Sequence, residues 1–121
     1  MDKIRTGIDM VEVSRLEQLA PAIRDRFLRR VFTPVELENS QGQIPTLAGR
    51  FAAKEAVAKT LGCGIGPVSW QEIEIQRGEQ GQPVLHLIGN ARRIADELGL
   101  VNWAISISHT RRNAIASVTG Y

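Results

Sequence analysis

The sequence contains almost no cysteine, no long apolar run and no leader-like start, and each of these shortages excludes a class of protein. Its 121 residues include one cysteine, Cys63. A single cysteine cannot form an internal disulfide, so the chain is not a disulfide-stapled scaffold and suits a reducing compartment. No apolar run approaches the roughly 18 residues of a membrane helix, and no signal-peptide core follows the first residues. We expect a cytoplasmic protein that forms a single domain over residues 1–121 and binds no membrane.

Lysine and aromatic residues are also scarce. Three of the fifteen basic residues are lysines and the rest are arginines, whose forked guanidinium groups suit phosphate and carboxylate. Between Arg15 and Arg30 five arginines accompany only two carboxylates, so a net charge of +2 for the chain hides a local basic patch. Such a patch is typical of a surface for nucleic acid, an acidic protein or a phosphorylated ligand, or of a solvated helix face. The few aromatic residues and the absence of a stacking motif count against nucleic acid.

The first third of the chain predicts a strand and a long helical segment. Residues 4–13 are rich in β-branched side chains, which is typical of a strand. Ser14 and Glu17 match a capping box, so we expect a helix to begin at Ser14, and Pro21 should kink this helix or split it in two. Three- and four-residue spacing predicts that its buried stripe consists of Leu16, Leu19, Ala20, Ile23, Phe27 and Val31.

The middle of the chain predicts two more helices. Thr33 precedes a proline and lies three residues before Glu36, which is a helix start with a capping box. Residues 39–43 are polar and predict a loop. Pro45 and Thr46 then open the strongest helix pattern, which covers residues 47–61 and ends at Gly62.

The rest of the chain predicts strands with one helix among them. Residues 68–77 and 84–88 predict a hairpin, and residues 103–108 and 113–118 predict two further strands. Residues 90–98 predict a short helix. This order predicts an α+β fold in which a largely antiparallel sheet packs on one long central helix.

The long helix carries the first candidate functional residues. Arg50, Lys54, Glu55 and Lys59 lie within a few turns of each other among small apolar residues. Glu55 and Lys59 form an i,i+4 pair, which on a surface contributes only about 0.2–0.5 kcal/mol. Alternatively, Glu55 binds a metal ion while Lys59, together with Arg50 or Lys54, binds phosphate. Spacing alone favours the surface ion pair.

Asp9 is a carboxylate inside the otherwise apolar segment 7–11. A carboxylate in such a strand is paired, bound to metal or on an exposed face. Mg²⁺ takes one or two carboxylates and leaves its other positions to water and phosphate oxygens. Asp9 and Glu55 would therefore be sufficient protein ligands if the strand lies against the helix.

The segment Ser106–Thr110 places a serine and a histidine where a strand ends. Ser108 and His109 are neighbours in sequence, so they are not the pair of a hydrolase triad, and the chain has no Gly-x-Ser-x-Gly elbow. Such residues more often bind phosphate or the backbone. One cysteine and two histidines make no zinc pattern, and His86, inside an apolar strand, indicates a structural histidine.

Taken in order, the motifs of this chain resemble the holo-[acyl-carrier-protein] synthase family. Each motif is weak alone, but the ordered series is very specific and covers nearly the whole chain. The motifs are Gly7-Ile8-Asp9-Met10-Val11-Glu12-Val13, Arg30-Val31-Phe32-Thr33-x-x-Glu36, Leu47-Ala48-Gly49-Arg50-Phe51-Ala52-Ala53-Lys54-Glu55-Ala56-x-x-Lys59, Gly62-x-Gly64-Ile65-Gly66, Trp70-Gln71-Glu72-Ile73-Glu74-Ile75, Gly81-x-Pro83 and Ser106-x-Ser108-His109-Thr110.

The resemblance implies a 4′-phosphopantetheinyl transferase of lipid metabolism. Such an enzyme moves phosphopantetheine from coenzyme A to a serine of an apo acyl carrier protein, depends on Mg²⁺ and releases adenosine 3′,5′-bisphosphate. The resemblance also implies a homotrimer with its active sites in the clefts between subunits.

The resemblance assigns roles to individual residues as well. Asp9 and Glu55 match the metal ligands of the family. Together with Lys59 they also match its catalytic residues. The residues expected at the coenzyme A site are Arg50, Lys54, Lys59, Gly64, Pro83, Ser108, His109 and Thr110. Those expected to dock the acidic carrier protein are Arg15, Arg24, Arg26 and Arg29.

Two alternatives stay open at this point. The base that activates the carrier serine is either Glu55 or a metal-bound water, and the water is favoured because a carboxylate bound to metal is a poor base. The chain could also bind coenzyme A as a regulator without catalysis, but the intact set of Asp9, Glu55 and Lys59 counts against this.

Overall fold

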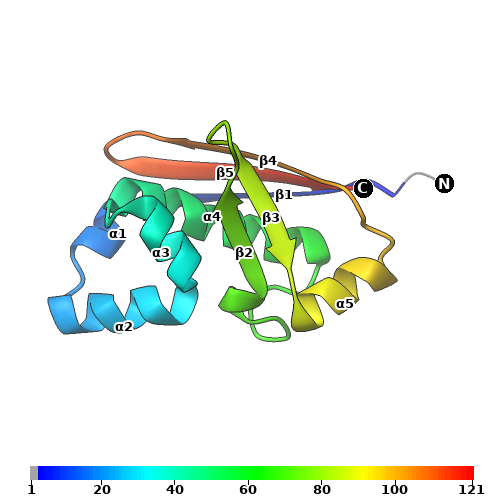
Figure 1. The fold of residues 1–121 in the computed structure, drawn as a ribbon, viewed down its shortest axis with the longest axis horizontal. Helices are drawn as coiled ribbons and strands as arrows, with labels where there is room; N and C mark the ends of the chain where they lie inside the picture. The colour runs from blue at the N-terminus through cyan, green and yellow to red at the C-terminus, as the bar shows by residue number, and fades with distance from the viewer. Residues whose placement is uncertain (1–2) are drawn as a thin grey trace.

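A long helix lying across a three-stranded antiparallel sheet forms the centre of the fold (Figure 1). The computed structural model describes residues 3–121. The helix is α4 (Ile44–Leu61), and the sheet has the strand order β1 (Arg5–Glu12), β5 (Asn113–Gly120) and β4 (Trp103–His109). The first and last strands of the chain are therefore neighbours, with Asp9 opposite Ala116. This confirms the predicted α+β fold with an antiparallel sheet on one long helix.

Small residues bring the sheet and α4 close together. A side chain at Gly7 of β1 would overlap the carbonyl of Ala56 and the hydroxyl of Thr60 on the helix. Gly49 has the matching role on the helix, since a Cβ there would press on Ile107 of β4. Because these positions are glycine, the strand backbone rests almost directly on the helix, and side chains next to Gly7 are held at the helix surface.

The two faces of the sheet differ sharply in exposure. Side chains alternate across a strand, and the face toward α4 buries Val11, Ala114, Ala116 and Val118. The opposite face leaves Ile8 59%, Met10 65% and Ile115 38% exposed. One side of the sheet is thus an apolar core, and the other is an open surface that carries large apolar side chains.

A hairpin and a short helix complete the other side of α4. Strands β2 (Ile73–Arg77) and β3 (Pro83–Leu87) pair antiparallel, and β2 buries Ile73 and Ile75. The predicted strand over 68–77 is only partly right, because its first half contains the 3₁₀ helix η1 (Trp70–Glu72). A capping box between Ser69 and Glu72 starts that turn. Helix α5 (Gly89–Glu97) follows the hairpin.

The predicted first helix is split in two, as Pro21 suggested. Helix α1 (Ser14–Glu17) ends before the proline and α2 (Pro21–Val31) begins at it. The predicted capping box at Ser14 is wrong, since Val13 is the N-cap and no side chain caps the helix. The predicted stripe is wrong around the break: Ile23 is 49% exposed, and Val31 is the buried residue of α2. An interrupted helix loses its periodic register, so one continuous stripe cannot face the core.

The other helix signals are confirmed with small shifts. Helix α3 (Pro34–Ser40) has Thr33 and Glu36 as a complete capping box, and it extends into the predicted loop. Gly62 ends α4 in the left-handed conformation, with a φ of 80°, as a C-terminal glycine does. Within residues 3–121 no helix combines the length and the apolarity that crossing a membrane requires.

Candidate active site

Asp9 lies against the C-terminal half of α4 because β1 packs there. It shares the helix-facing side of the strand with Gly7, two residues before it. Its Oδ1 lies 2.9 Å from Nζ of Lys59, which also donates to the backbone carbonyl of Ile8 at 2.9 Å. The Asp9 side chain is 19% exposed and that of Lys59 is 53% exposed. The site therefore opens to solvent on the side of the lysine.

Glu55 lies one helical turn before Lys59 and brings a second carboxylate to the same place. Burial raises the pKa of Glu55, and the negative charge of Asp9 raises it further. Lys59 and Arg15 oppose this rise. The two carboxylates are thus close enough to repel each other, and two cationic side chains only partly compensate for the repulsion.

The donor set of this pair fits a hard divalent cation. Two carboxylates whose negative charges interact are stabilised by a cation between them, and carboxylate oxygens are the ligands that Mg²⁺ prefers. Residues 3–121 hold no group of three or more potential metal-binding His, Cys, Asp or Glu residues. Asp9 and Glu55 would then supply two ligands and leave the remaining positions to water and a phosphate-bearing substrate.

Lys54 does not lie in this site, contrary to the sequence expectation. Its side chain is fully buried, and Nζ lies 2.7 Å from Oε1 of Glu36. The ammonium also donates to the carbonyl of Trp70 at 3.0 Å and lies 5.5 Å from the centre of the Phe32 ring. Burial lowers the pKa of Lys54, and Glu36 partly offsets this effect. A lysine enclosed in this way has no face left for a phosphate group.

Arg50 is also drawn into the interior of the chain. Its side chain is 8% exposed and Nη1 approaches the carbonyl of Gln76 at 3.5 Å. Burial lowers the pKa of Arg50, Glu36 opposes this, and Arg77 adds to it. Of the cations predicted on α4, Lys59 is therefore the one that reaches solvent beside Asp9 and Glu55.

The segment Ser108–Thr110 lies at the far edge of the sheet. His109 pairs with Ala114, which pairs with Val11, so His109 is two strands away from β1. Two strand spacings amount to about 10 Å. The hydroxyl of Thr110 accepts the backbone N–H groups of Arg112 and Asn113 and so closes the β4–β5 turn. Within one chain, these residues do not join the two carboxylates.

Gly64 and Pro83 lie outside α4, the first in a loop and the second in the hairpin. Gly64 follows the end of the helix with a φ of 68°, and nothing lies within 4 Å of the place a Cβ would occupy. Pro83 begins β3 opposite Arg77. The backbone at Gly64 is thus open to the close approach of another molecule.

The predicted docking arginines lie along α1 and α2. Arg15, Arg26 and Arg29 are exposed, while Arg24 is half-buried and reaches the carbonyl of Glu17 at 3.5 Å. Arg15 also borders an apolar hollow of about 260 Å³. The other residues that line the hollow are Val11, Leu16, Leu19, Phe27 and Phe51.

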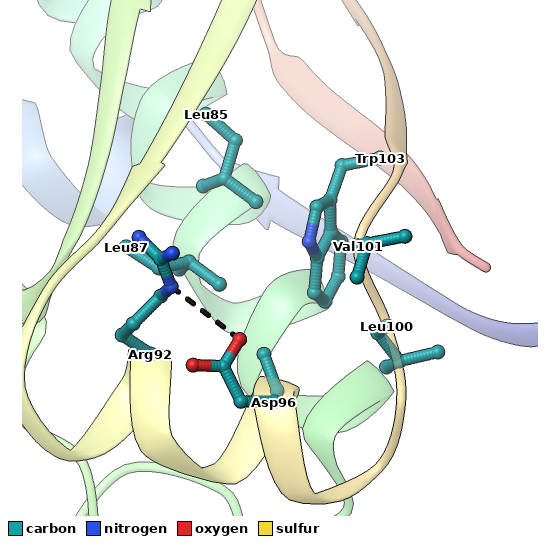
Figure 2. A pocket seen from close by; sticks show the side chains of 8 residues that line it. Leu85, Leu87, Arg92, Asp96, Leu100, Val101 and Trp103 are labelled. Carbon is teal, nitrogen blue, oxygen red and sulfur yellow. Dashed lines mark hydrogen bonds and ion pairs between the residues drawn. The ribbon is translucent and has the colours of Figure 1, made fainter.

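A second groove lies between β3, α5 and β4. Figure 2 shows the indole of Trp103 on one side and the Arg92–Asp96 ion pair on the other, 3.4 Å between Nε and Oδ1. Leu85, Leu87 and Leu100 contribute apolar surface to its lining. None of the predicted site residues lines this groove of about 240 Å³.

Sequence reasoning missed two partners of the site. Arg15 is close enough to Glu55 to lower its pKa, and it was expected only at the docking surface. Glu36 was expected only as a helix cap, yet it is the buried counter-ion of Lys54. Its position three residues after Thr33 predicts the cap, but no local signal predicts a contact with a lysine 18 residues later in the chain.

Comparison with known proteins identifies the family. Residues 5–116 match the model of the 4′-phosphopantetheinyl transferase superfamily. The holo-[acyl-carrier-protein] synthase of Herpetosiphon aurantiacus is 42% identical over 122 residues, covering 95% of this chain and 96% of that protein. That of Halothermothrix orenii is 44% identical over 117 residues, covering 94% of each chain.

Solved structures agree with the sequence comparison. The Helicobacter pylori holo-[acyl-carrier-protein] synthase in complex with coenzyme A has a TM-score of 0.86 and 32% identity, and the match covers 96% of this chain and 99% of that one. The enzyme of Neisseria meningitidis also has a TM-score of 0.86 and 32% identity, with 97% of each chain covered. The resemblance expected from the ordered motifs is confirmed, and the chain belongs to the 4′-phosphopantetheinyl transferase superfamily.

Proposed function

We propose that this protein transfers 4′-phosphopantetheine from coenzyme A to a serine of an apo acyl carrier protein. The serine oxygen forms a bond to the phosphorus that carries pantetheine. The bond from that phosphorus to the bridging oxygen breaks, and adenosine 3′,5′-bisphosphate leaves. The observation that carries the proposal is the convergence of Asp9, Glu55 and Lys59 where β1 meets α4, in a chain of this superfamily.

The three side chains divide the work by charge. Asp9 and Glu55 would hold Mg²⁺, which when bound neutralises negative charge on the pyrophosphate. Lys59 is a point cation with an exposed ammonium, so it can move from Asp9 to a phosphate oxygen and stabilise the charge that develops on the leaving group. Arg15, beside Glu55, adds positive charge on the side from which the carrier serine would arrive.

The site is completed by a second subunit in a homotrimer. Ser108, His109 and Thr110 lie two strand spacings, about 10 Å, across the sheet from β1, so they do not contact Asp9 of the same chain. A neighbouring subunit would bring its own turn to the cleft, next to Gly64 and Pro83. The open sheet face, with Ile8, Met10 and Ile115 exposed, provides an apolar surface for this contact.

The trimer can be tested by placing a charge on that face. Met10→Glu should dissociate the assembly in sedimentation and lower transfer activity, because the carboxylate would be buried at the contact. Val101→Glu is the control, since Val101 is 75% exposed and lies outside the sheet. A wild-type chain that sediments as a monomer while fully active would overturn the proposal.

The basic surface of α1 and α2 docks the carrier protein. Arg24 and Arg29 present positive charge to an acidic partner, and the hollow bordered by Arg15, Phe27 and Phe51 offers an apolar contact beside them. Charge steers the encounter, and the apolar contact gives the bound pose its short-range stability. With this carrier and cofactor, we place the enzyme in the cytoplasm.

One incubation tests the whole proposal. The protein is mixed with coenzyme A, Mg²⁺ and an apo acyl carrier protein, and the carrier is weighed by mass spectrometry. A mass gain of one phosphopantetheine that disappears when a chelator replaces Mg²⁺ supports the transferase. Binding of coenzyme A without any mass gain would instead indicate a regulator. A salt-dependent complex with nucleic acid, without any mass gain of the carrier, would indicate a nucleic-acid-binding protein.

A further inference from the structure

The 3₁₀ turn η1 connects the arginine-rich helix α2 to the catalytic helix α4. We propose that Gln71 in this turn is a positioning residue, which fixes α2 at the angle needed to dock the carrier protein. The proposal rests on the proposed function, because it assigns Gln71 to carrier recognition and not to coenzyme A binding or catalysis.

Helix α2 has little other attachment to the body of the protein. Val31 is its buried residue, while Phe27 and Leu28 are only partly buried. Its most extensive contact with another element is with η1. A helix held so lightly could tilt or fray, so the contact with η1 decides where its side chains point.

The side chain of Gln71 donates hydrogen bonds to two backbone carbonyls at the C-terminal end of α2. Neither carbonyl receives the backbone N–H that it would accept in a longer helix. In a continuing helix, the N–H of Thr33 would bond the carbonyl of Arg29 and the N–H of Glu36 would bond that of Phe32. Both N–H groups are instead used in the capping box of α3, at 2.9 and 3.2 Å. The side-chain amide of Gln71 replaces them, donating to the carbonyl of Arg29 at 2.7 Å and to that of Phe32 at 3.2 Å.

The amide orientation of Gln71 follows from its partners. Both acceptors are carbonyl oxygens, so only the NH₂ end of the side chain can face them. A glutamate of the same shape would present acceptors to acceptors at the negative end of the helix dipole. The contact therefore requires a donor at residue 71 and not merely a side chain of that size.

The turn that carries Gln71 is itself fixed to α4. The carbonyl of Trp70 accepts the buried ammonium of Lys54 at 3.0 Å, and Lys54 directly precedes Glu55. The Trp70 ring lies 5.0 Å from that of Phe51, which in turn lies 5.5 Å from that of Phe27 on α2. One connected set of contacts thus extends from the catalytic helix through η1 to the docking helix.

The consequence is a division between the two substrates. Coenzyme A approaches Lys59 and the loop at Gly64. Gln71 borders a hollow of about 370 Å³ together with Ile65 and Gly66 of that loop, but its side-chain amide donates to the end of α2. The carrier protein approaches the arginines of α2, including Arg29, whose backbone carbonyl Gln71 holds. Loss of the amide should therefore weaken carrier recognition selectively.

The first test measures α2 itself, without any substrate. Gln71→Ala and Gln71→Glu should speed hydrogen exchange of the α2 amides while the amides of α4 stay as protected as in the wild type. Gln71→Lys should restore protection, because an ammonium can donate to the same carbonyls at a helix C-terminus. Gln43→Ala is the matched control, since Gln43 is exposed and its side chain makes no hydrogen bond within residues 3–121. Unchanged α2 exchange in both variants would overturn the proposal.

The second test uses transfer kinetics in the intact enzyme. Gln71→Ala and Gln71→Glu should raise KM for the apo carrier about fivefold, as expected for the loss of hydrogen bonds of this kind. KM for coenzyme A and kcat should be unchanged, and Gln71→Lys should recover most of the loss. Equal increases for both substrates, or a fall in kcat alone, would overturn the positioning role. Failure of the proposed function is a different result, because wild type would then transfer nothing while the exchange test still applied.

Discussion

Nζ of Lys59 lies 2.9 Å from Oδ1 of Asp9, so a residue expected to bind phosphate is paired with a residue expected to bind metal. The Lys59 side chain is about half exposed, and a pair of this kind contributes little to stability. Another cation can therefore easily replace Lys59 as the partner of Asp9. A divalent cation arriving at Asp9 would displace the ammonium toward the substrate phosphates.

This competition predicts that Lys59→Met has opposite effects on Mg²⁺ affinity and on the rate of transfer. Mg²⁺ should bind the coenzyme A-free protein a few-fold more tightly, because Asp9 no longer has a competing cation. Transfer should slow by about a hundredfold, because the cation on the leaving phosphate is lost. Calorimetric Mg²⁺ titration and transfer kinetics measure the two effects. Weaker Mg²⁺ binding in the variant would contradict the competition.

Removal of either carboxylate should abolish Mg²⁺-dependent transfer. Asp9→Ala and Glu55→Ala should each lower kcat by about a hundredfold or more, since several kcal/mol of charge stabilisation is lost with the ion. Circular dichroism should show an intact fold in both variants. Glu38→Ala, which removes an exposed carboxylate from α3, serves as the control. Normal turnover in either site variant would refute the metal assignment.

The raised pKa of Glu55 predicts a stability effect of known sign. The folded state binds the Glu55 proton more tightly than the unfolded chain, so ionisation destabilises the metal-free protein as pH rises through the folded pKa. Glu55→Gln should therefore raise the Tm of the metal-free protein at neutral pH. The gain should vanish at a pH below the ordinary glutamate pKa, where both proteins are uncharged at this position.

The raised pKa of Glu55 also controls the pH dependence of metal binding. Only the ionised carboxyl binds Mg²⁺ well. Affinity for the ion should therefore fall, on acidification, at a higher pH than for an ordinary glutamate. Mg²⁺ titrations across pH provide the measurement. A Tm for Glu55→Gln below that of wild type at neutral pH, without metal, would show that the attraction to Lys59 and Arg15 outweighs burial and the charge of Asp9.

The buried pair of Lys54 and Glu36 should act on stability and not on coenzyme A. Lys54→Met leaves the Glu36 carboxylate buried without its counter-ion, and should lower the free energy of unfolding by about 3 kcal/mol or more. Urea unfolding measures this loss. The double variant Lys54→Met with Glu36→Gln should lose less than the two single variants combined. A loss of coenzyme A affinity with unchanged stability would contradict this structural role and indicate that Lys54 binds a phosphate of coenzyme A.

Charge reversal on α2 should separate the two substrates. Arg24→Glu, Arg26→Glu or Arg29→Glu should raise KM for the carrier severalfold more than KM for coenzyme A, and the effect should shrink at high salt. Arg93→Glu on α5 is the matched control, because Arg93 is exposed and pairs only locally with Glu97 at 2.8 Å. Equal changes for both substrates would contradict the docking surface.

Local chemistry made much of this protein predictable from its sequence. Three local features depend only on residues a few positions apart. They are the capping box of Thr33 and Glu36, the end of α4 at Gly62 and the alternation of the hairpin strands. Such signals need no knowledge of the rest of the chain. The ordered motifs were sufficient to predict the family, and the resemblance assigned Asp9, Glu55 and Lys59 to one site.

Signals that continue across a break in structure failed. The apolar spacing from Leu16 to Val31 suggested one stripe, but the chain turns at Pro21 and each short helix has its own orientation. The strand pattern from residue 68 likewise begins with η1, because the capping box of Ser69 and Glu72 takes precedence over alternation there. Periodicity predicts orientation only within one uninterrupted element.

The fate of the two α4 lysines was decided by tertiary structure. Residue spacing alone places Lys54 and Lys59 on one helix, five residues and therefore about 140° apart around its axis. Only packing decided which element each would meet. Lys54 points to Glu36 and Trp70 and is buried, whereas Lys59 points to Asp9 and stays open to solvent. The same residue type is thus a structural counter-ion in one place and a candidate catalytic cation in the other.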